Sequence, residues 1–370
     1  MKVMGIIFSN IYDNSLGELT NHRTVASLPF GGRYRQIDFS LSNMSNSGIY
    51  NIGIITKYNY RSLMDHLGNC GAWDLNRKNE GVVVLPPFAE SNMGSVYKGK
   101  LEALYTARHF IDNPKYDYVV ICDTTVLCNV DFRKIIEHHV KSEKDVTIIS
   151  CAKSKNKTYP LVLKADGEDS VTEMRIDSTP DDGNCVGMGM FVISRSLLVD
   201  AIREAHSKGY VHFERDYLQR KFNENAIKLG VYRFDGTVLF NGDIASYYEN
   251  NMALLNKEVR DGIFLKDSPI CTKVRDEHPT YYEEGTKVSN CIIADGCVMR
   301  GIAEDSVIFR EVVIEKGAHV KSSIIMQGAK IGEGAKLEYV ILDKNVTVTA
   351  GASLKGTPRH PVIIKKGEIV

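Results

Sequence analysis

The 370-residue sequence has no excess of either charge, few cysteines and no long hydrophobic run. Lys+Arg and Asp+Glu number 46 each, which argues against a nucleic-acid partner or a membrane surface. None of the eight cysteines belongs to a Cys-x-x-Cys pair, so we expect buried free thiols and a cytoplasmic protein. The apolar stretch of residues 1–9 is too short to cross a bilayer and lacks a cleavage site, which indicates a first strand.

Residues 1–261 alternate short apolar runs with amphipathic stretches. In one of these stretches Phe132, Ile135, Ile136 and Val140 recur at helical spacing. Strands alternating with such helices predict an α/β nucleotidyltransferase-type domain with a mostly parallel, Rossmann-like sheet covered on both faces. The predicted strands are 4–9, 52–56, 82–85, 118–122, 146–150, 188–194 and 227–232, and the predicted helices are 37–47, 61–67, 101–111, 132–142, 196–207, 215–222 and 244–255.

The rest of the chain has a different pattern. Residues 262–280, which contain Pro269 and Pro279, are predicted to be a linker. In residues 281–370 a six-residue period predicts a left-handed parallel β-helix of hexapeptide repeats, with one apolar side chain of each repeat inside the prism. A β-sandwich with accidental spacing is the alternative. The recurring residues are Ile308, Ile314, Val320, Met326, Ile331, Leu337, Leu342, Val348 and Leu354.

The segment of residues 29–43, PFGGRYRQIDFSLSN, is highly specific. It resembles the PFGGKYRxIDFxLSN block of the glucose-1-phosphate adenylyltransferase family, also called ADP-glucose pyrophosphorylases. The resemblance spans nearly the whole chain, because the family also carries a C-terminal β-helix. It implies the reaction of ATP with glucose 1-phosphate to give ADP-glucose and pyrophosphate, which depends on positioning and charge neutralisation. Further matching blocks follow in order at residues 46–49, 56–58, 66–68, 73–75, 85–88, 97–99, 103–105 and 247–252.

Active members of the family resemble one another in a GGxGTRL loop after the first strand. Glycines there let backbone N–H groups reach the triphosphate. The corresponding residues 10–16 are NIYDNSL, so the three glycines are absent, Ser15 replaces the arginine and Asp13 would repel a triphosphate. A lysine of the family falls on Val25. The comparison implies a loop that cannot hold ATP in the usual way.

The resemblance also implies two metal-binding aspartates, whose positions fall on Thr125 and Phe240. A hydroxyl and a phenyl group cannot replace hard anionic oxygen donors. We therefore expect no catalytic residue, metal or cofactor in this chain, and Mg²⁺ in a catalytic partner. An active transferase with relocated ligands stays open, because Asp123 lies two residues before Thr125 and Asp243 three after Phe240. The competing interpretation is that Asp123 ends a strand and Asp243 caps a helix.

The sugar-phosphate pocket implied by the resemblance is altered as well. The lysine of the family's EKP motif falls on Asp177, and the serine of its SMG motif falls on Gly187. Tyr97 is retained, and Glu102 replaces an aspartate. We expect these four positions to form a vestigial substrate site.

Losses at the nucleotide, metal and sugar positions together resemble the non-catalytic, regulatory GlgD-type subunit of the family. The resemblance implies a catalytically deficient subunit of glycogen biosynthesis that modulates a catalytic paralogue in a hetero-oligomer, expected to be a tetramer, with a homo-oligomer as the state of the chain alone. Arg33, Arg35 and Lys57 lie where family members gather anionic regulators, so they are candidate regulator-binding residues. A hypothesis of another class is a β-helix acyltransferase or binding module with His319 as general base, although a lone corner histidine is more often solvated.

Overall fold

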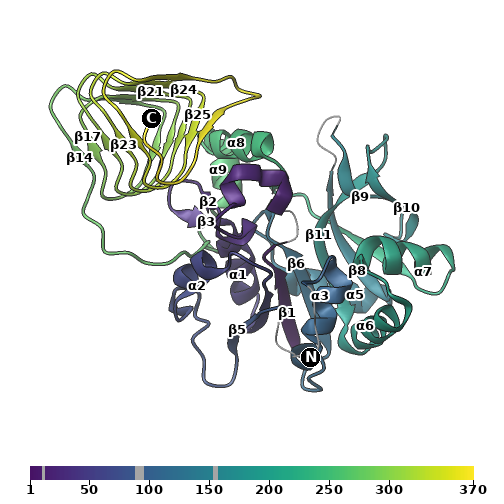
Figure 1. The fold of residues 1–370 in the computed structure, drawn as a ribbon. Helices are drawn as coiled ribbons and strands as arrows, with labels where there is room; N and C mark the ends of the chain where they lie inside the picture. The colour runs from purple at the N-terminus through teal and green to yellow at the C-terminus, as the bar shows by residue number, and fades with distance from the viewer. Residues whose placement is uncertain (11–12, 88–95, 153–156) are drawn as a thin grey trace.

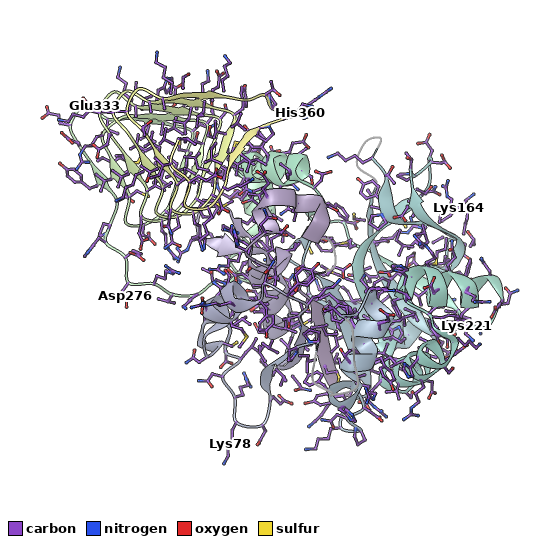
Figure 2. All side chains as sticks on the ribbon, in the orientation of Figure 1. Lys78, Lys164, Lys221, Asp276, Glu333 and His360 are labelled. Carbon is purple, nitrogen blue, oxygen red and sulfur yellow. The ribbon has the colours of Figure 1, made fainter. Side chains whose placement is uncertain are left out.

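The computed structural model describes residues 1–10, 13–87, 96–152 and 157–370, except for the side chains of residues 13 and 14. An α/β domain is followed by a β-helix that lies against one end of it (Figure 1). None of the helices in these ranges combines the length and the hydrophobicity needed to cross a bilayer. Charged side chains such as Lys164, Lys221 and Glu333 project from the outside of both parts (Figure 2).

One nine-stranded sheet forms the centre of the first domain. Its strands are β1 (Val3–Phe8), β4 (Asn51–Ile55), β5 (Gly81–Leu85), β6 (Tyr118–Asp123), β8 (Val146–Ala152), β9 (Tyr159–Ala165), β10 (Val171–Ser178), β11 (Cys185–Ser194) and β12 (Leu229–Arg233). The order is β10-β9-β11-β6-β1-β4-β5, and β8 pairs with β11 and β12. Strands β5, β4, β1 and β6 are parallel neighbours, whereas β11 runs antiparallel to β6, β8 and β9. All seven predicted strands are present, and the antiparallel β9–β10 pair was not predicted.

Helices cover both faces of the sheet. The helices of the described residues are α1 (Gln36–Asn46), α2 (Arg61–Leu67), α3 (Lys100–Thr106), α4 (Arg108–Ile111), α5 (Phe132–Ser142), α6 (Arg195–Lys208), α7 (Arg220–Asn223), α8 (Ile244–Ala253) and α9 (Lys257–Ile263), with the 3-10 turns η1 (Asp13–Thr20), η2 (Val25–Ser27) and η3 (Gly71–Trp73) and the π-helix η4 (Phe213–Gln219). The buried apolar side chains of α3, α4, α6 and η4 pack on one face, and those of α1, α2 and α5 pack on the other.

Two helix predictions were wrong in detail. The predicted helix 101–111 is divided into α3 and α4 at Ala107. The hydroxyl of Thr106 donates to the carbonyl of Ala103 at 2.7 Å, a local bond that competes with the helical hydrogen-bond pattern. The predicted helix 215–222 is the π-helix η4 continued by the short α7.

The C-terminal part is a left-handed parallel β-helix built from three five-stranded sheets, which confirms the predicted fold class. The first sheet contains β14 (Tyr281–Tyr282), β17 (Val298–Met299), β20 (Val313–Ile314), β23 (Lys330–Ile331) and β26 (Thr347–Val348); the second contains β15 (Lys287–Ser289), β18 (Ile302–Glu304), β21 (His319–Lys321), β24 (Lys336–Glu338) and β27 (Ser353–Lys355); the third contains β16 (Ile292–Ile293), β19 (Val307–Ile308), β22 (Ile324–Ile325), β25 (Val340–Leu342) and β28 (Val362–Ile364). The predicted domain boundary after residue 261 falls inside α9, and β14 begins at Tyr281.

The interior of the β-helix corrects one expectation. Ile308 pairs with Ile325, and Ile325 pairs with Leu342, so one of the three steps in each coil is five residues long instead of six. The prediction that Met326 fills the prism was therefore wrong by one residue. Ile325 packs inside the prism, and Met326 packs against the first domain.

A shared apolar cluster and the buried ion pair of Arg23 with Asp343 join the two parts. Phe30 and Tyr247 of the first domain pack in one cluster with Ile324 and Met326 of the β-helix. The small hairpin β2 (Pro29–Phe30) and β3 (Tyr34–Arg35) lies at this junction (Figure 1). Burial of aromatic and aliphatic side chains stabilises such a junction by about 25 cal/mol per Å² removed from water.

Candidate functional site

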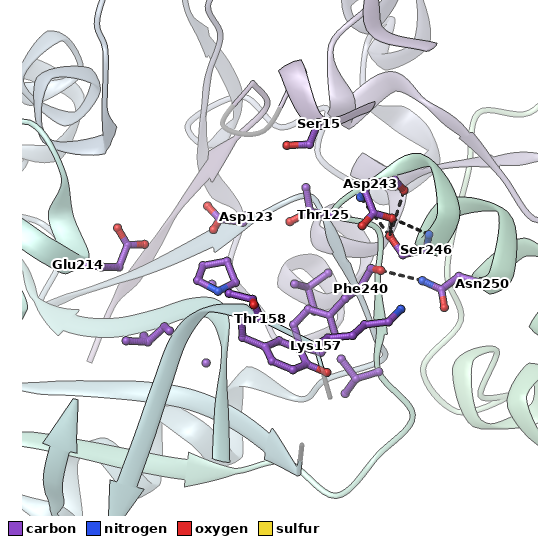
Figure 3. Close-up of a pocket in the computed structure, with 18 of the residues that line it drawn as sticks. Ser15, Asp123, Thr125, Lys157, Thr158, Glu214, Phe240, Asp243, Ser246 and Asn250 are labelled. Carbon is purple, nitrogen blue, oxygen red and sulfur yellow. Dashed lines mark hydrogen bonds between the residues drawn. The ribbon is translucent and has the colours of Figure 1, made fainter. Parts of the chain in front are cut away.

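A cavity of about 320 Å³ opens beyond the end of β6, between β9, β11 and α8 (Figure 3). Open α/β sheets place their ligands at the carboxyl ends of parallel strands, and β6 ends at Asp123 on this edge. Two short strands, β7 (Val126–Leu127) and β13 (Leu239–Phe240), pair with each other beside the cavity. The structure therefore brings Ser15, Asp123, Thr125, Gly187, Phe240 and Asp243 to one cavity.

Thr125 and Phe240 supply no anionic oxygen to this cavity. Thr125 is buried, and its backbone carbonyl accepts a hydrogen bond from the amide of Asn241 at 2.8 Å. The ring of Phe240 packs edge-on against the ring of Tyr159, with 5.4 Å between the centroids. Divalent cations such as Mg²⁺ take carboxylate and carbonyl oxygens. The residues at these two positions do not fit the metal that the family's reaction needs.

Asp243 is engaged as a helix cap. Its Oδ1 accepts hydrogen bonds from the amide and the hydroxyl of Ser246, both at 2.7 Å, at the start of α8. This confirms the interpretation of Asp243 as an N-cap. Within the described ranges, no cluster of three or more His, Cys, Asp or Glu side chains is suited to hold a metal ion.

Asp123 ends β6 and is paired with a buried lysine. Its Oδ2 accepts from Nζ of Lys100 at 2.8 Å, and Lys100 also forms an ion pair with Glu214 on η4. Burial raises the pKa of Asp123 to about 6, although Lys100 opposes this shift. Lys100 and Glu214 were not predicted, because a lysine at the start of an amphipathic helix gives no local signal of burial.

The structure describes only part of the altered phosphate loop, and it places the described residues in different surroundings. Ile11 and Tyr12, and the side chain of Asp13, lie outside the described residues. Ser15 lies on η1 and lines the cavity. Val25 is fully buried in the apolar cluster at the domain junction, so its side chain is a core residue.

The four vestigial sugar-site residues do not form one pocket. Tyr97 and Asp177 line a second cavity of about 240 Å³, whereas Gly187 lines the first. A Cβ atom at Gly187 would lie 2.7 Å from the side chain of Leu161. Glu102 accepts a hydrogen bond from the amide of Lys98 at the start of its own helix, and Asp177 forms an exposed ion pair with a neighbouring arginine.

Two of the three candidate regulator residues lie together at the domain junction. Arg33 and Arg35 line a narrow cavity of about 30 Å³ beside the β-helix. Lys57 lies in the second cavity instead, with its ammonium nitrogen 5.6 Å from the centroid of the Tyr97 ring. We call the narrow one the basic cavity, after the basic side chains that line it: Arg33, Arg35, Lys273, Arg275, Arg310 and Lys344. The last four are distant in sequence and were not predicted.

The basic side chains that line the basic cavity crowd one another, and one of them has nitrogens without an acceptor among the described residues. Burial, with Arg35 and Arg23 nearby, lowers the pKa of Lys344 to about 6. Burial also lowers the pKa of Arg35 to about 10. Nε and one terminal nitrogen of Arg310 form no hydrogen bond within the described part of the chain, although a carboxylate oxygen of Asp295 lies 3.7 Å from Nε. The unpaired guanidinium nitrogens of Arg310, beside other basic side chains, fit an anion in this cavity.

His319 is the first residue of β21 and pairs with Ile302 and Lys336 in the neighbouring coils, so it lies on a strand and not in the corner turn before it. Its Nε2 lies 3.2 Å from Oε2 of Glu304, and both side chains are more than a third exposed. An exposed imidazole–carboxylate pair on the outside of a coil is typical of a solvated surface residue. The geometry does not favour the acyltransferase hypothesis.

Two protein-family models match the chain. Residues 13–257 match the nucleotidyl transferase family, and residues 274–358 match the GlmU-like C-terminal hexapeptide family. The order of the two matches agrees with the α/β domain and the β-helix. Fold and cleft together define a nucleotidyltransferase domain followed by a hexapeptide-repeat β-helix.

Sequence identity to individual proteins narrows this class to one family. The chain is 32% identical to the glycogen biosynthesis protein GlgD of Bacillus subtilis (strain 168) over 372 residues, which covers 99% of this chain and 96% of that protein. It is 30% identical over 357 residues to the glucose-1-phosphate adenylyltransferases of Bacillus thuringiensis (strain Al Hakam) and Bacillus anthracis, covering 96% of this chain and 95% of each. The chain therefore belongs to the glucose-1-phosphate adenylyltransferase family, as residues 29–43 predicted.

Proposed function

We propose that this chain is a regulatory, catalytically deficient subunit of glucose-1-phosphate adenylyltransferase that modulates a catalytic paralogue in glycogen biosynthesis. The observation that carries the proposal is the chemistry of Thr125 and Phe240, which stand at the positions of the two metal-binding aspartates in the resemblance. Without anionic metal ligands, the leaving pyrophosphate would lack the charge neutralisation that the reaction needs. The similarity to GlgD, whose name gives glycogen biosynthesis, supports the pathway.

Regulation by an anion is the mode of action that the basic cavity supports. Arg33 and Arg35 come from the first domain, and Arg310 and Lys344 come from the β-helix. An anion bound among them would contact both parts, so its binding would bias how the two parts sit in an assembly. The regulator class is therefore a phosphorylated or other multivalent anion, and Lys57 stays a separate candidate in the second cavity.

Assembly through the first coil of the β-helix is the association that the surface supports. Strands β14, β15 and β16 each end their sheet, so one side of each is unpaired in the part that the structure describes. Tyr281 and Tyr282 on this coil are 56% and 51% exposed. Unpaired strand edges and exposed aromatic side chains are typical of association surfaces. We propose a hetero-oligomer with the catalytic subunit, a tetramer in the simplest case, in the cytoplasm.

An activity assay tests the proposed function. The purified chain with ATP, glucose 1-phosphate and Mg²⁺ should form no ADP-glucose above the protein-free rate. Added to the catalytic subunit, it should raise the turnover of that subunit or change its response to anionic regulators. Robust synthesis by the isolated chain, abolished by Asp123→Asn, would instead establish the active transferase with relocated ligands.

A further inference from the structure

A buried cation that belongs to the chain itself lies between the two cavities: Lys100 lines the second cavity, Asp123 lines the first, and Glu214 lines both. We call this place the cleft floor. Lys100, the first residue of α3, is 4% exposed. Its Nζ lies 2.8 Å from Oδ2 of Asp123 at the end of β6 and forms a second ion pair with Glu214 on η4. Two carboxylates from separate elements therefore converge on one nitrogen. Figure 3 shows Asp123 and Glu214 at the same end of the cavity.

The surrounding residues are shaped around this ion group. The rings of Phe8 and Phe191 lie with their centroids 5.8 and 5.5 Å from Nζ of Lys100, so aromatic faces line the rest of the site. Gly189 of β11 has φ +65°, and a Cβ atom there would lie 2.4 Å from Oδ2 of Asp123. A side chain at that position would displace the carboxylate from the lysine.

One carboxylate oxygen in this group has no hydrogen-bond partner among the residues that the structure describes. Oδ1 of Asp123 makes no hydrogen bond within the described ranges, and Asp123 is 2% exposed. Buried polar atoms are normally hydrogen-bonded, so the bare oxygen marks unused coordinating capacity. Two convergent carboxylates with a free oxygen are the ligands that a hard divalent cation takes, and the ammonium group occupies the point where they meet.

We propose that Lys100 is the resident cation of this cleft, and that its ammonium replaces a divalent metal ion between Asp123 and Glu214. The lysine holds β6, α3 and η4 together, so the shape of the cleft floor does not depend on metal. This inference concerns the chain by itself and stands whether or not the chain regulates a partner. The consequence is that removing the ammonium should uncover a metal site.

Manganese binding tests the proposal. Isothermal titration of the full-length chain with MnCl₂ should show no site that depends on Asp123, whereas Lys100→Gln should gain one that binds at least about tenfold more tightly than anything in the wild type. Lys100→Gln/Asp123→Asn should lose that site again. The melting temperature of the wild type should be the same with MnCl₂ and with KCl at matched ionic strength, whereas MnCl₂ should raise that of Lys100→Gln.

Lys98→Gln is the matched control, because Lys98 is exposed and lies two residues away on the same segment. It should bind manganese as the wild type does. If Lys100→Gln folds but gains no site, or Lys98→Gln gains the same site, the proposal is overturned. If Lys100→Gln does not fold, titration of wild type and Asp123→Asn still decides: an Asp123-dependent site in the wild type refutes the proposal, and identical weak isotherms support it.

Discussion

Arg23 and Asp343 form a buried ion pair between the two parts of the chain, and removing either partner should destabilise their junction. Nη2 of Arg23 lies 2.6 and 2.9 Å from the two carboxylate oxygens of Asp343, and the side chains are 3% and 4% exposed. Breaking a buried pair leaves one charge uncompensated, which typically costs about 3–5 kcal/mol. Asp343→Asn should reach the upper part of that range, because Arg23 would then face Arg35 and Lys344 without an anion.

Arg23→Met should cost less, because the carboxylate of Asp343 still faces Lys344. The double variant Arg23→Met/Asp343→Leu should cost less than Asp343→Asn alone, since no buried charge of the pair remains. Urea unfolding followed by fluorescence measures these differences, because Trp73 is the single tryptophan and is buried in the first domain. Circular dichroism reports on the whole chain. If both single variants cost under about 1 kcal/mol, the pair behaves as a solvated surface pair and the reasoning is refuted.

Three further predictions concern single positions. Isothermal titration should show sulfate binding to the basic cavity up to about 50-fold more tightly at pH 6 than at pH 8. The reason is that burial lowers the pKa of Lys344 to about 6 and the anion requires the protonated lysine. Lys344→Met should remove this pH dependence. Gly189→Ala should lower the free energy of unfolding in urea by about 2–4 kcal/mol, because the new methyl group would press on Asp123. Gly183→Ala, at φ +82° in open space, should lower it by about 1 kcal/mol, and equal losses would contradict the contact. Asp243→Ala should cost about 1 kcal/mol through loss of the helix cap and Asp243→Asn almost nothing, and a large loss in the asparagine variant would speak for a role beyond capping.

Local patterns in the sequence were sufficient for most of the architecture, although not for the antiparallel β9–β10 pair. All seven strands predicted from alternating apolar runs are present in the structure, since periodicities of 2 and 3.6 are properties of a few neighbouring residues. The six-residue period located the β-helix for the same reason. It failed at Met326, because the shortened step of each coil is set by the pairing of Ile308 with Ile325 and Ile325 with Leu342, which lie in successive coils.

The candidate site was less accessible to such reasoning. The sequence suggested the replacements proposed at Thr125 and Phe240, because both residues stand beside blocks that match the family. Lys100 was not recognised, since its partners Asp123 and Glu214 are 23 and 114 residues away. A charged residue at the start of a helix is usually solvated, and burial with two carboxylates is a property of the folded arrangement.

The sequence by itself determined the family, the α/β domain and the β-helix, and the family resemblance predicted that Thr125 and Phe240 replace two metal-binding aspartates, because each inference follows from residues close together in the chain. Only the tertiary structure decided where the charges act. It placed Arg33 and Arg35 beside Arg310 and Lys344, and it placed Lys57 in another cavity. Electrostatic interaction depends on distance and burial in space, and neither quantity can be read from separation along the chain.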